Sequence, residues 1–290
     1  MKTVSQPDAA VGDKVDYTIN GTIPSYGTQF ENPVYKITDT ITNAKYASDI
    51  TVTIGGEKAT AGTDYTITGG NAEDSNFEIS FTNVGAYYNK TDAERAVVIT
   101  YKAEILASAT SINPAKNTAK LTYSNKPGST KDATEKKTYT YTFELDDEFT
   151  KVDENGNPLD GCTFTLTNKN TKKVYTCTTK NVDGKAKIHF EGLDAGEYTL
   201  VETVAKDGYS INNTKYTVVI TPEYNTDGTL KSKTITIDGK TDKVVVRNTK
   251  ISALPSTGGI GTTIFTIAGC VIMIAAAGLF FASRKKSDNK

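Results

Sequence analysis

The sequence contains no tryptophan, one histidine and three cysteines. The single histidine, His189, has no second histidine with which to form a zinc site or a histidine-based catalytic set. Three cysteines in 290 residues are too few for a disulfide framework. The chain also lacks a glycine-rich phosphate loop, and its net charge of −1 gives no electrostatic basis for binding nucleic acid. We therefore expect no cofactor, no metal ion and no nucleic acid partner, and a protein that is not an enzyme.

Long helical patterns are also scarce. Residues 1–126 and 139–250 instead contain short stretches in which every second residue is apolar, separated by Gly, Asn, Asp and Pro turns. Thr, Tyr, Val and Ile are plentiful, and these residue types favour strands. The pattern predicts an all-β chain with two tandem antiparallel β-sandwiches. Residues 127–138 show no apolar periodicity, so we expect a linker or an exposed loop there.

Each predicted sandwich has a lysine, an acid and an asparagine on its apolar face. Glu202, for example, falls on the face of Leu200 and Val204. Charged side chains are almost never buried unless they are paired, because an unpaired buried ion is very costly. The same three residue types near the first, middle and last strands of both segments therefore form a pattern. The triplets are Lys2, Asp39 and Asn117 in the first segment, and Lys151, Glu202 and Asn248 in the second.

These three residue types permit a specific reaction. Burial disfavours the charged forms of a lysine and a carboxyl group, which leaves a neutral amine beside a protonated acid. The amine can then attack the asparagine carbonyl while the acid polarises it and shuttles protons, so that ammonia leaves and a Lys–Asn isopeptide bond remains. A buried Lys–acid ion pair with the asparagine as a hydrogen-bonding neighbour is the alternative. In the first segment, Asn113 and Asn125 are alternative candidates for the position given to Asn117. Lys36 is an alternative candidate to Lys2, but in its strand it falls on the opposite face to Asp39.

The C-terminus departs from the β pattern. An uncharged apolar run covers residues 260–282, and a basic tail covers residues 283–290. A helix over this run would reach roughly 34 Å, enough to cross a hydrocarbon core of about 30 Å. Because the basic cluster follows the run, the positive-inside rule places residues 1–259 outside the membrane. The run predicts a transmembrane helix over residues 260–282. It is preceded by the motif Leu254, Pro255, Ser256, Thr257 and Gly258.

Motif, apolar run and basic tail, in this order, resemble the cell-wall sorting signal of Gram-positive surface proteins; a plain membrane anchor is the alternative. The resemblance implies that sortase cuts between Thr257 and Gly258 and passes the Thr257 carbonyl to an amine of a neighbouring pilin subunit or of peptidoglycan. The apolar helix would hold the precursor in the membrane and would then be removed. The mature protein would lie on the cell wall or in a pilus.

Several stretches of both predicted sandwiches match a known family: residues 150–153, 156–164, 196–203 and 245–250 in the second, and 11–15, 35–40, 62–65 and 117–125 in the first. On these stretches both sandwiches resemble parts of SpaA-type pilins. The second is similar to the Cna-B domain, an immunoglobulin-like sandwich, and that resemblance assigns Glu202 to the family's E-box and Asn248 to its terminal strand. The first is similar to the middle domain of pilin backbone subunits, which implies that Lys2, Asp39 and Asn117 react there.

The chain departs from these families in two ways. Cys162 stands where a small Ala is usual. Because Cys177 lies in the same predicted hairpin, two alternatives remain: a Cys162–Cys177 disulfide, or two free thiols. The Tyr-Pro-Lys motif that backbone pilins carry in an upstream domain is absent, and residues 1–4 lack the apolar region of a signal peptide. We expect a truncated N-terminus. The resemblances imply a shaft subunit of a sortase-assembled pilus; a wall-anchored adhesin or minor pilin that binds a host surface ligand and uses these domains as a stalk is the alternative.

Overall fold

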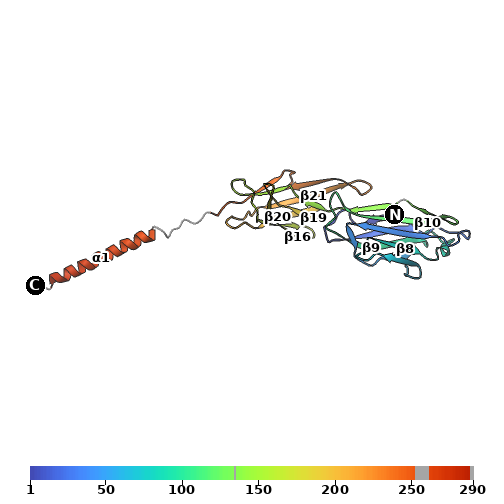
Figure 1. The fold of residues 1–290 in the computed structure, drawn as a ribbon, viewed down its shortest axis with the longest axis horizontal. Helices are drawn as coiled ribbons and strands as arrows, with labels where there is room; N and C mark the ends of the chain where they lie inside the picture. Colours follow the sequence, from blue (N-terminus) through green and yellow to red (C-terminus); the bar gives the residue numbers. More distant parts are fainter. Residues whose placement is uncertain (134, 252–260, 288–290) are drawn as a thin grey trace. The chain divides into compact units, whose positions relative to one another are not determined.

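The computed structural model describes residues 1–133, 135–251 and 261–287, with side chains of the C-terminal helix described from residue 264 to 279. The chain divides into two units, Met1–Thr249 and Lys250–Lys290. Strands run throughout the first unit (Figure 1). The second unit contains one helix, α1 (Gly261–Ser287). The prediction of an all-β chain with a single C-terminal helix is therefore confirmed.

The N-terminal part of the first unit consists of two six-stranded sheets around one core. In the first sheet β9 is central, and its residues Val97, Ile99 and Tyr101 are buried because alternate β-branched and aromatic side chains face inward. This sheet has the order β1-β2-β9-β5-β6, and β4 also pairs with β9. Its strands are β1 (Lys2–Val4), β2 (Lys14–Thr22), β4 (Ala44–Tyr46), β5 (Thr51–Ile54), β6 (Glu57–Lys58) and β9 (Ala96–Ile105).

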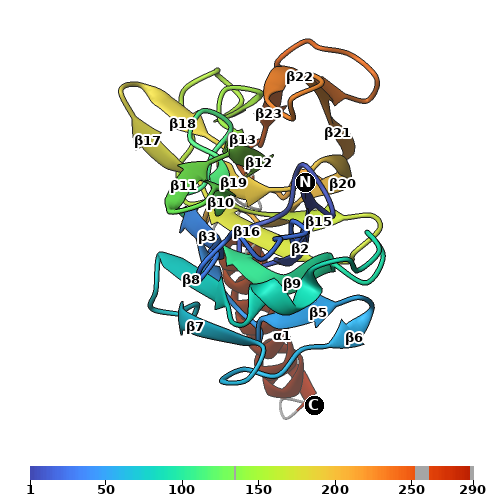
Figure 2. The same ribbon diagram turned by 90° about the vertical axis from the view of Figure 1, so that its right-hand side faces the viewer.

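The second sheet of this core has the order β11-β10-β3-β8-β7, and β12 also pairs with β10 (Figure 2). β3 and β10 run antiparallel with Ala119 opposite Asp39 and Asn117 opposite Ile41. One 3₁₀ helix, η1 (Val84–Tyr87), follows β8. The strands are β3 (Tyr35–Thr42), β7 (Tyr65–Gly69), β8 (Asn76–Phe81), β10 (Ala115–Lys126), β11 (Ser129–Asp132) and β12 (Lys136–Thr140).

Residues 127–138, expected to be a linker, contain β11 and the first part of β12. Both strands are hydrogen-bonded to β10, so this part of the prediction is wrong. The sequence pattern failed to predict these strands because their side chains face water and not the core. Most side chains of β11 are exposed, and the first two residues of β12 are exposed as well, so these residues need no apolar alternation.

The second core follows from Tyr141 onward and has its own apolar cluster. Three sheets surround it: β16-β15-β20-β21-β22, β17-β18-β14-β23, and the pair β13-β19. β14 and β23 pair in parallel, whereas most other neighbours are antiparallel. The strands are β13 (Phe143–Leu145), β14 (Phe149–Val152), β15 (Thr163–Asn168), β16 (Val174–Thr178), β17 (Lys180–Val182), β18 (Lys185–Lys187), β19 (Phe190–Leu193), β20 (Gly196–Val204), β21 (Lys215–Tyr224), β22 (Leu230–Ile237) and β23 (Val244–Arg247).

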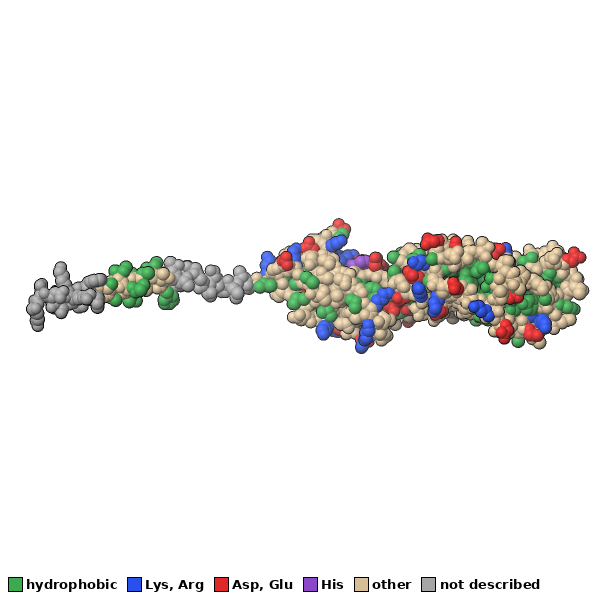
Figure 3. Space-filling view, turned by 90° about the horizontal axis from the view of Figure 1, so that it is seen from below, with side chains coloured by type: hydrophobic (Ala, Val, Ile, Leu, Met, Phe, Trp, Pro, Cys, Tyr) green, Lys and Arg blue, Asp and Glu red, His purple; other side chains and the backbone are tan. Residues whose placement is uncertain are grey.

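The chain between β1 and β2 connects the two cores. Asp8 accepts a hydrogen bond from the Tyr224 hydroxyl at 2.7 Å and pairs with Tyr141 in an isolated β-bridge. Asp13 accepts a bond from Lys173 Nζ at 2.9 Å. On the face of the unit shown in Figure 3, acidic and basic side chains are intermixed, in keeping with the net charge of −1.

Apolar side chains cover the described part of α1. Within the residues that the structure describes, no helix has the length and apolarity needed to cross a membrane. The helix predicted over residues 260–282 coincides with α1 from Gly261 onward, and part of that stretch lies outside the described side chains.

Candidate functional site

The second core brings Lys151, Glu202 and Asn248 together. Lys151 lies in β14 opposite Val246 of β23, and Asn248 follows directly after β23. The Asn248 amide donates to the Val152 carbonyl at 3.0 Å, which extends the parallel pairing by one residue. Glu202 comes from β20 in another sheet. All three side chains are buried, with Lys151 0% exposed.

Their polar atoms form a closed ring of hydrogen bonds. Lys151 Nζ donates to Glu202 Oε2 at 3.2 Å and also to Asn248 Oδ1. Asn248 Nδ2 donates to Glu202 Oε1 at 2.6 Å. The acid therefore contacts both the amine and the carboxamide nitrogen. Glu202 Oε2 also accepts a bond from the Asn212 amide at 3.1 Å, which fixes the carboxyl group in place.

Burial governs the electrostatics of this ring. It lowers the pKa of Lys151 below its usual value, and the nearby Glu202 opposes that shift only in part. The Lys151 Nζ lies 5.8 Å from the centre of the Phe164 ring, so an apolar surface covers one side of the amine. This environment makes the neutral, nucleophilic form of the amine accessible.

The first core brings Lys2, Asp39 and Asn117 together from β1, β3 and β10. They are 6%, 0% and 0% exposed. Lys2 Nζ contacts Asp39 Oδ2 at 2.5 Å, and burial lowers the pKa of Lys2 while Asp39 opposes that shift. Lys2 is in one sheet and the other two residues are in the facing sheet. The triplet therefore joins the two layers of this sandwich.

Sequence reasoning missed a fourth member of the first cluster, Tyr101 of β9. Its hydroxyl accepts hydrogen bonds from Lys2 Nζ and from Asn117 Nδ2, each at 2.7 Å, and donates to Asp39 Oδ1 at 2.8 Å. The ring stacks on Tyr17 with centroids 5.4 Å apart. Burial raises the pKa of the Tyr101 hydroxyl well above its usual value, so it stays protonated. A buried tyrosine hydroxyl usually has a polar partner. That rule was the only indication in the sequence that Tyr101 would join a polar cluster.

The rival residues lie outside the first cluster. Asn113 and Asn125 are exposed. Lys36 is half-buried and pairs with Glu78 at 3.1 Å. One predicted neighbour of the second cluster is also elsewhere: Val204 is 54% exposed, because the pairing of β20 with β15 shifts register next to Glu202 and reverses the faces beyond it.

Cys162 and Cys177 are free, which corrects the disulfide alternative. In the β15–β16 hairpin Cys177 lies opposite Phe164, whereas the Cys162 amide bonds to Thr179 Oγ1 at 3.1 Å. The two cysteines are therefore offset along the hairpin. Cys162 Sγ instead lies 3.9 Å from Asn248 Nδ2.

Thiol titration should find both cysteines free in the denatured, unreduced chain. Burial raises the pKa values of both thiols, and that of Cys177 to about 11, so in the native chain both should react slowly. A reducing agent should leave the melting temperature unchanged. A chain that gains two reactive thiols only after reduction would contradict the assignment.

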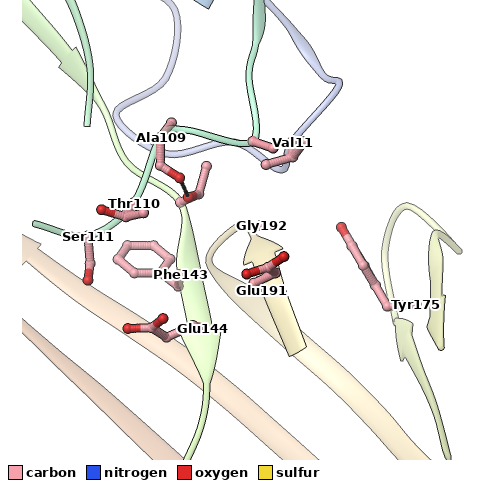
Figure 4. A pocket seen from close by; sticks show the side chains of 11 residues that line it. Val11, Ala109, Thr110, Ser111, Phe143, Glu144, Tyr175, Glu191 and Gly192 are labelled. Carbon is pink, nitrogen blue, oxygen red and sulfur yellow. Dashed lines mark hydrogen bonds between the residues drawn. The ribbon is translucent and has the colours of Figure 1, made fainter. Parts of the chain in front are cut away.

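One pocket lies near the junction of the two cores. Val11, Ala109 and Phe143 form part of its apolar lining, and Thr142 Oγ1 donates to the Ala109 carbonyl there (Figure 4). Glu144 and Glu191 are its only charged side chains among the described lining residues. The pocket therefore has no lysine with which to repeat the chemistry of the two clusters. Among the described residues, no group of His, Cys, Asp or Glu side chains is arranged to hold a metal ion.

Comparisons with known proteins give the two clusters a context. The family model "SpaA: Prealbumin-like fold domain" matches residues 146–234, and the model "LPXTG cell wall anchor motif" matches residues 247–289. The chain carries a SpaA-type domain and an LPXTG anchor. The SpaA-type domain contains Lys151 and Glu202. The anchor match contains Asn248 and the motif of residues 254–258, which lies outside the residues that the structure describes.

A curated relative extends the likeness over nearly the whole chain. The trypsin-resistant surface T6 protein of Streptococcus pyogenes is 24% identical, and the alignment covers 98% of this chain and 67% of the relative. The cell-wall anchor of this chain rests on the match to the LPXTG motif at residues 247–289.

Solved structures share the fold of this chain. The group B streptococcus pilus 2b backbone protein is 22% identical, with a TM-score of 0.57 over 88% of this chain and 99% of that one. A C-terminal fragment of the major pilin of Streptococcus agalactiae is 19% identical, with a TM-score of 0.60 over 85% and 98%. The pilus backbone of Streptococcus pneumoniae is 16% identical, with a TM-score of 0.57 over 84% and 94%. These likenesses extend over both sandwiches.

Proposed function

We propose that this protein is a shaft subunit of a sortase-assembled pilus, held together internally by two Lys–Asn isopeptide bonds. The observation that carries the proposal is an LPXTG anchor on a chain whose fold matches pilus backbone proteins across both sandwiches. The two buried triplets support the second half of it. The structural neighbours named as pilus backbones favour a shaft subunit over the stalk of an adhesin.

The reaction in the second sandwich follows from the ring of contacts. The neutral Lys151 amine attacks Cγ of Asn248, and the Nζ–Cγ bond forms. The proton that the amine sheds passes to Glu202, whose Oε1 lies 2.6 Å from Asn248 Nδ2. From there a proton passes to Nδ2 as the Cγ–Nδ2 bond breaks, and ammonia leaves. Because the product is an amide within the fold, each molecule reacts once.

The same reaction in the first sandwich would join Lys2 to Asn117 with Asp39 as the acid. Three aromatic rings from neighbouring strands surround this site: Tyr46 and Phe77 pack edge-on against Tyr101, and Tyr17 stacks on it. They exclude water from the amine. An uncharged amine is favoured in such surroundings, and hydrolysis of the product is disfavoured.

The sortase step is tested by Thr257→Ala. In a host with sortase, the wild-type chain is expected to end at Thr257, amide-linked to a pilin lysine or to peptidoglycan, without residues 258–290. The variant should lose nearly all covalent attachment, because the enzyme transfers the Thr257 carbonyl. Mass spectrometry of wall-digest fragments measures the outcome.

Ser256→Ala is the matched control, since it occupies the variable position of the motif and should anchor as the wild type does. Mature wall material that retains Gly258 onward would refute the sorting function. It would leave the isopeptide chemistry unaffected, because that chemistry needs only the folded sandwiches.

A further inference from the structure

We propose that Tyr101 is the proton relay of the first sandwich, carrying a proton from Asp39 to the departing nitrogen of Asn117. This inference rests on the proposed Lys2–Asn117 bond and adds a residue that its lysine, acid and asparagine triplet does not include. It is carried by a difference between the two clusters.

The difference lies in how the acid meets the carboxamide. In the second sandwich Glu202 contacts Asn248 Nδ2 directly at 2.6 Å. In the first sandwich the contact of Asn117 Nδ2 is the Tyr101 hydroxyl at 2.7 Å, and that hydroxyl donates to Asp39 Oδ1 at 2.8 Å. An aspartate side chain is one methylene shorter than a glutamate side chain. The phenol hydroxyl fills the place that the longer acid occupies in the other cluster.

Tyr101 is held in this position from several directions. Its ring stacks on Tyr17 at 5.4 Å and meets Phe77 edge-on at 5.3 Å. The Tyr46 hydroxyl donates to Asp39 Oδ1 at 3.1 Å, so the carboxyl oxygen that accepts from Tyr101 is itself fixed. Lys2 Nζ lies 5.2 Å from the centre of the Tyr101 ring and donates to its hydroxyl. One hydroxyl group thus touches the nucleophile, the acid and the leaving nitrogen.

The steps balance as follows. Lys2 and Asp39 share one proton, and the form with a neutral amine attacks Cγ of Asn117. When the Nζ–Cγ bond has formed, Nζ still carries the proton that it must lose. As the Cγ–Nδ2 bond breaks, Tyr101 gives its hydroxyl proton to Nδ2 and takes one from Asp39, and the Asp39 carboxylate accepts the proton that Nζ sheds. The products are a secondary amide, ammonia and Asp39 in its protonated form.

The first cluster also contains one unpartnered atom of the carboxamide. Asn117 Oδ1 is buried without a hydrogen-bond partner. Such a group is costly, and the cost is removed when the carboxamide is consumed or turned. Rotation by half a turn about Cβ–Cγ would bring Oδ1 to the Tyr101 hydroxyl, which would then polarise the carbonyl. In both orientations, the group that contacts the carboxamide is Tyr101.

Tyr101→Phe in the full chain tests the relay, because it removes the hydroxyl and keeps the ring. The rate of ammonia loss from the first sandwich should fall by about 100-fold, the size of a general-acid contribution. Intact mass over time and the cross-linked peptide containing Lys2 and Asn117 give the rate. Ammonia loss from the second sandwich of the same molecule should be unchanged, which serves as an internal control for folding and handling.

Two further variants separate the relay from packing. Tyr17→Phe removes a buried hydroxyl from the ring stacked on Tyr101 and should react at the wild-type rate. In Tyr101→Phe with Asp39→Glu, the longer acid should reach Nδ2 directly, as Glu202 does, and restore much of the rate. Such rescue would not follow from a purely structural role for the hydroxyl.

The outcomes distinguish the relay from the function on which it rests. If the wild type shows no Lys2–Asn117 peptide, the proposed first bond fails and the relay fails with it. If the wild type forms the bond and Tyr101→Phe forms it equally fast, the relay alone is overturned. The relay is also overturned if Tyr17→Phe is slowed as much as Tyr101→Phe.

Discussion

The Asn248→Ala variant is expected to keep the full sequence mass of the second sandwich, whereas the wild type should lose one ammonia there. Lys151 and Asn248 are 97 residues apart, and closing a loop of that length is worth about 4–5 kcal/mol in the loop-entropy model for cross-links. The variant keeps the Lys151–Glu202 pair, so its loss of stability reports the cross-link. The expected drop in the melting temperature of this sandwich is on the order of 20 °C, measured by calorimetry.

Glu202→Gln tests the acid in the same sandwich. It should also keep the full mass, because the glutamine cannot take up and return a proton. It should be less stable than Asn248→Ala, since it leaves Lys151 buried without a counter-charge, and breaking a buried pair costs about 3–5 kcal/mol. A wild-type chain of full sequence mass with both sandwiches folded would leave the buried ion pair as the role of the triplet.

Asn117→Ala should have a comparable effect on the first sandwich. The proposed bond from Lys2 closes a loop of about 115 residues, worth about 4–5 kcal/mol in the same model. β1 has three residues and pairs only with β2 within the described sheet, so without the bond it should detach first. Hydrogen exchange of the β1 and β2 amides and the intact mass together measure this.

Asn125→Ala is the matched control for that variant. Asn125 lies in the same strand, β10, but is exposed. The Asn125→Ala variant should therefore lose as much ammonia as the wild type, and the amides of β1 should stay protected from exchange. Equal protection of β1 in Asn117→Ala and in the wild type would contradict the first bond. It would not affect the second, which lies in a separate core.

Strand parity was enough to locate the buried triplets. Asp39 between two inward isoleucines, and Asn248 two residues after Val246, are anomalies that a two-residue period exposes directly. The alternation of side chains along a strand does not predict which residues of facing sheets come into contact. It therefore could not predict that Tyr101 lies in the first cluster. Tyrosine on an apolar face is ordinary, and only its hydroxyl bonds distinguish this one.

The wrong predictions have local causes. Val204 follows a register shift in β20, and a shift of one residue moves side chains to the opposite face. The disulfide alternative assumed that two cysteines in one hairpin would meet, but their register places Phe164 opposite Cys177. The strands within residues 127–138 are polar because their side chains face water, and a polar strand has the composition of a loop.

Those polar strands bear on how a shaft would transmit force. With both bonds in place, tension entering near Asn248 would pass to Lys151, along the backbone to Asn117, and across to Lys2, so residues 3–116 and 152–247 would carry none of it. Only residues 118–150 would remain extensible, with a contour length of roughly 110 Å. An unstructured linker there would extend under low force. Because β11 and β12 are paired with β10, their hydrogen bonds must break before this segment can extend and the subunit can lengthen.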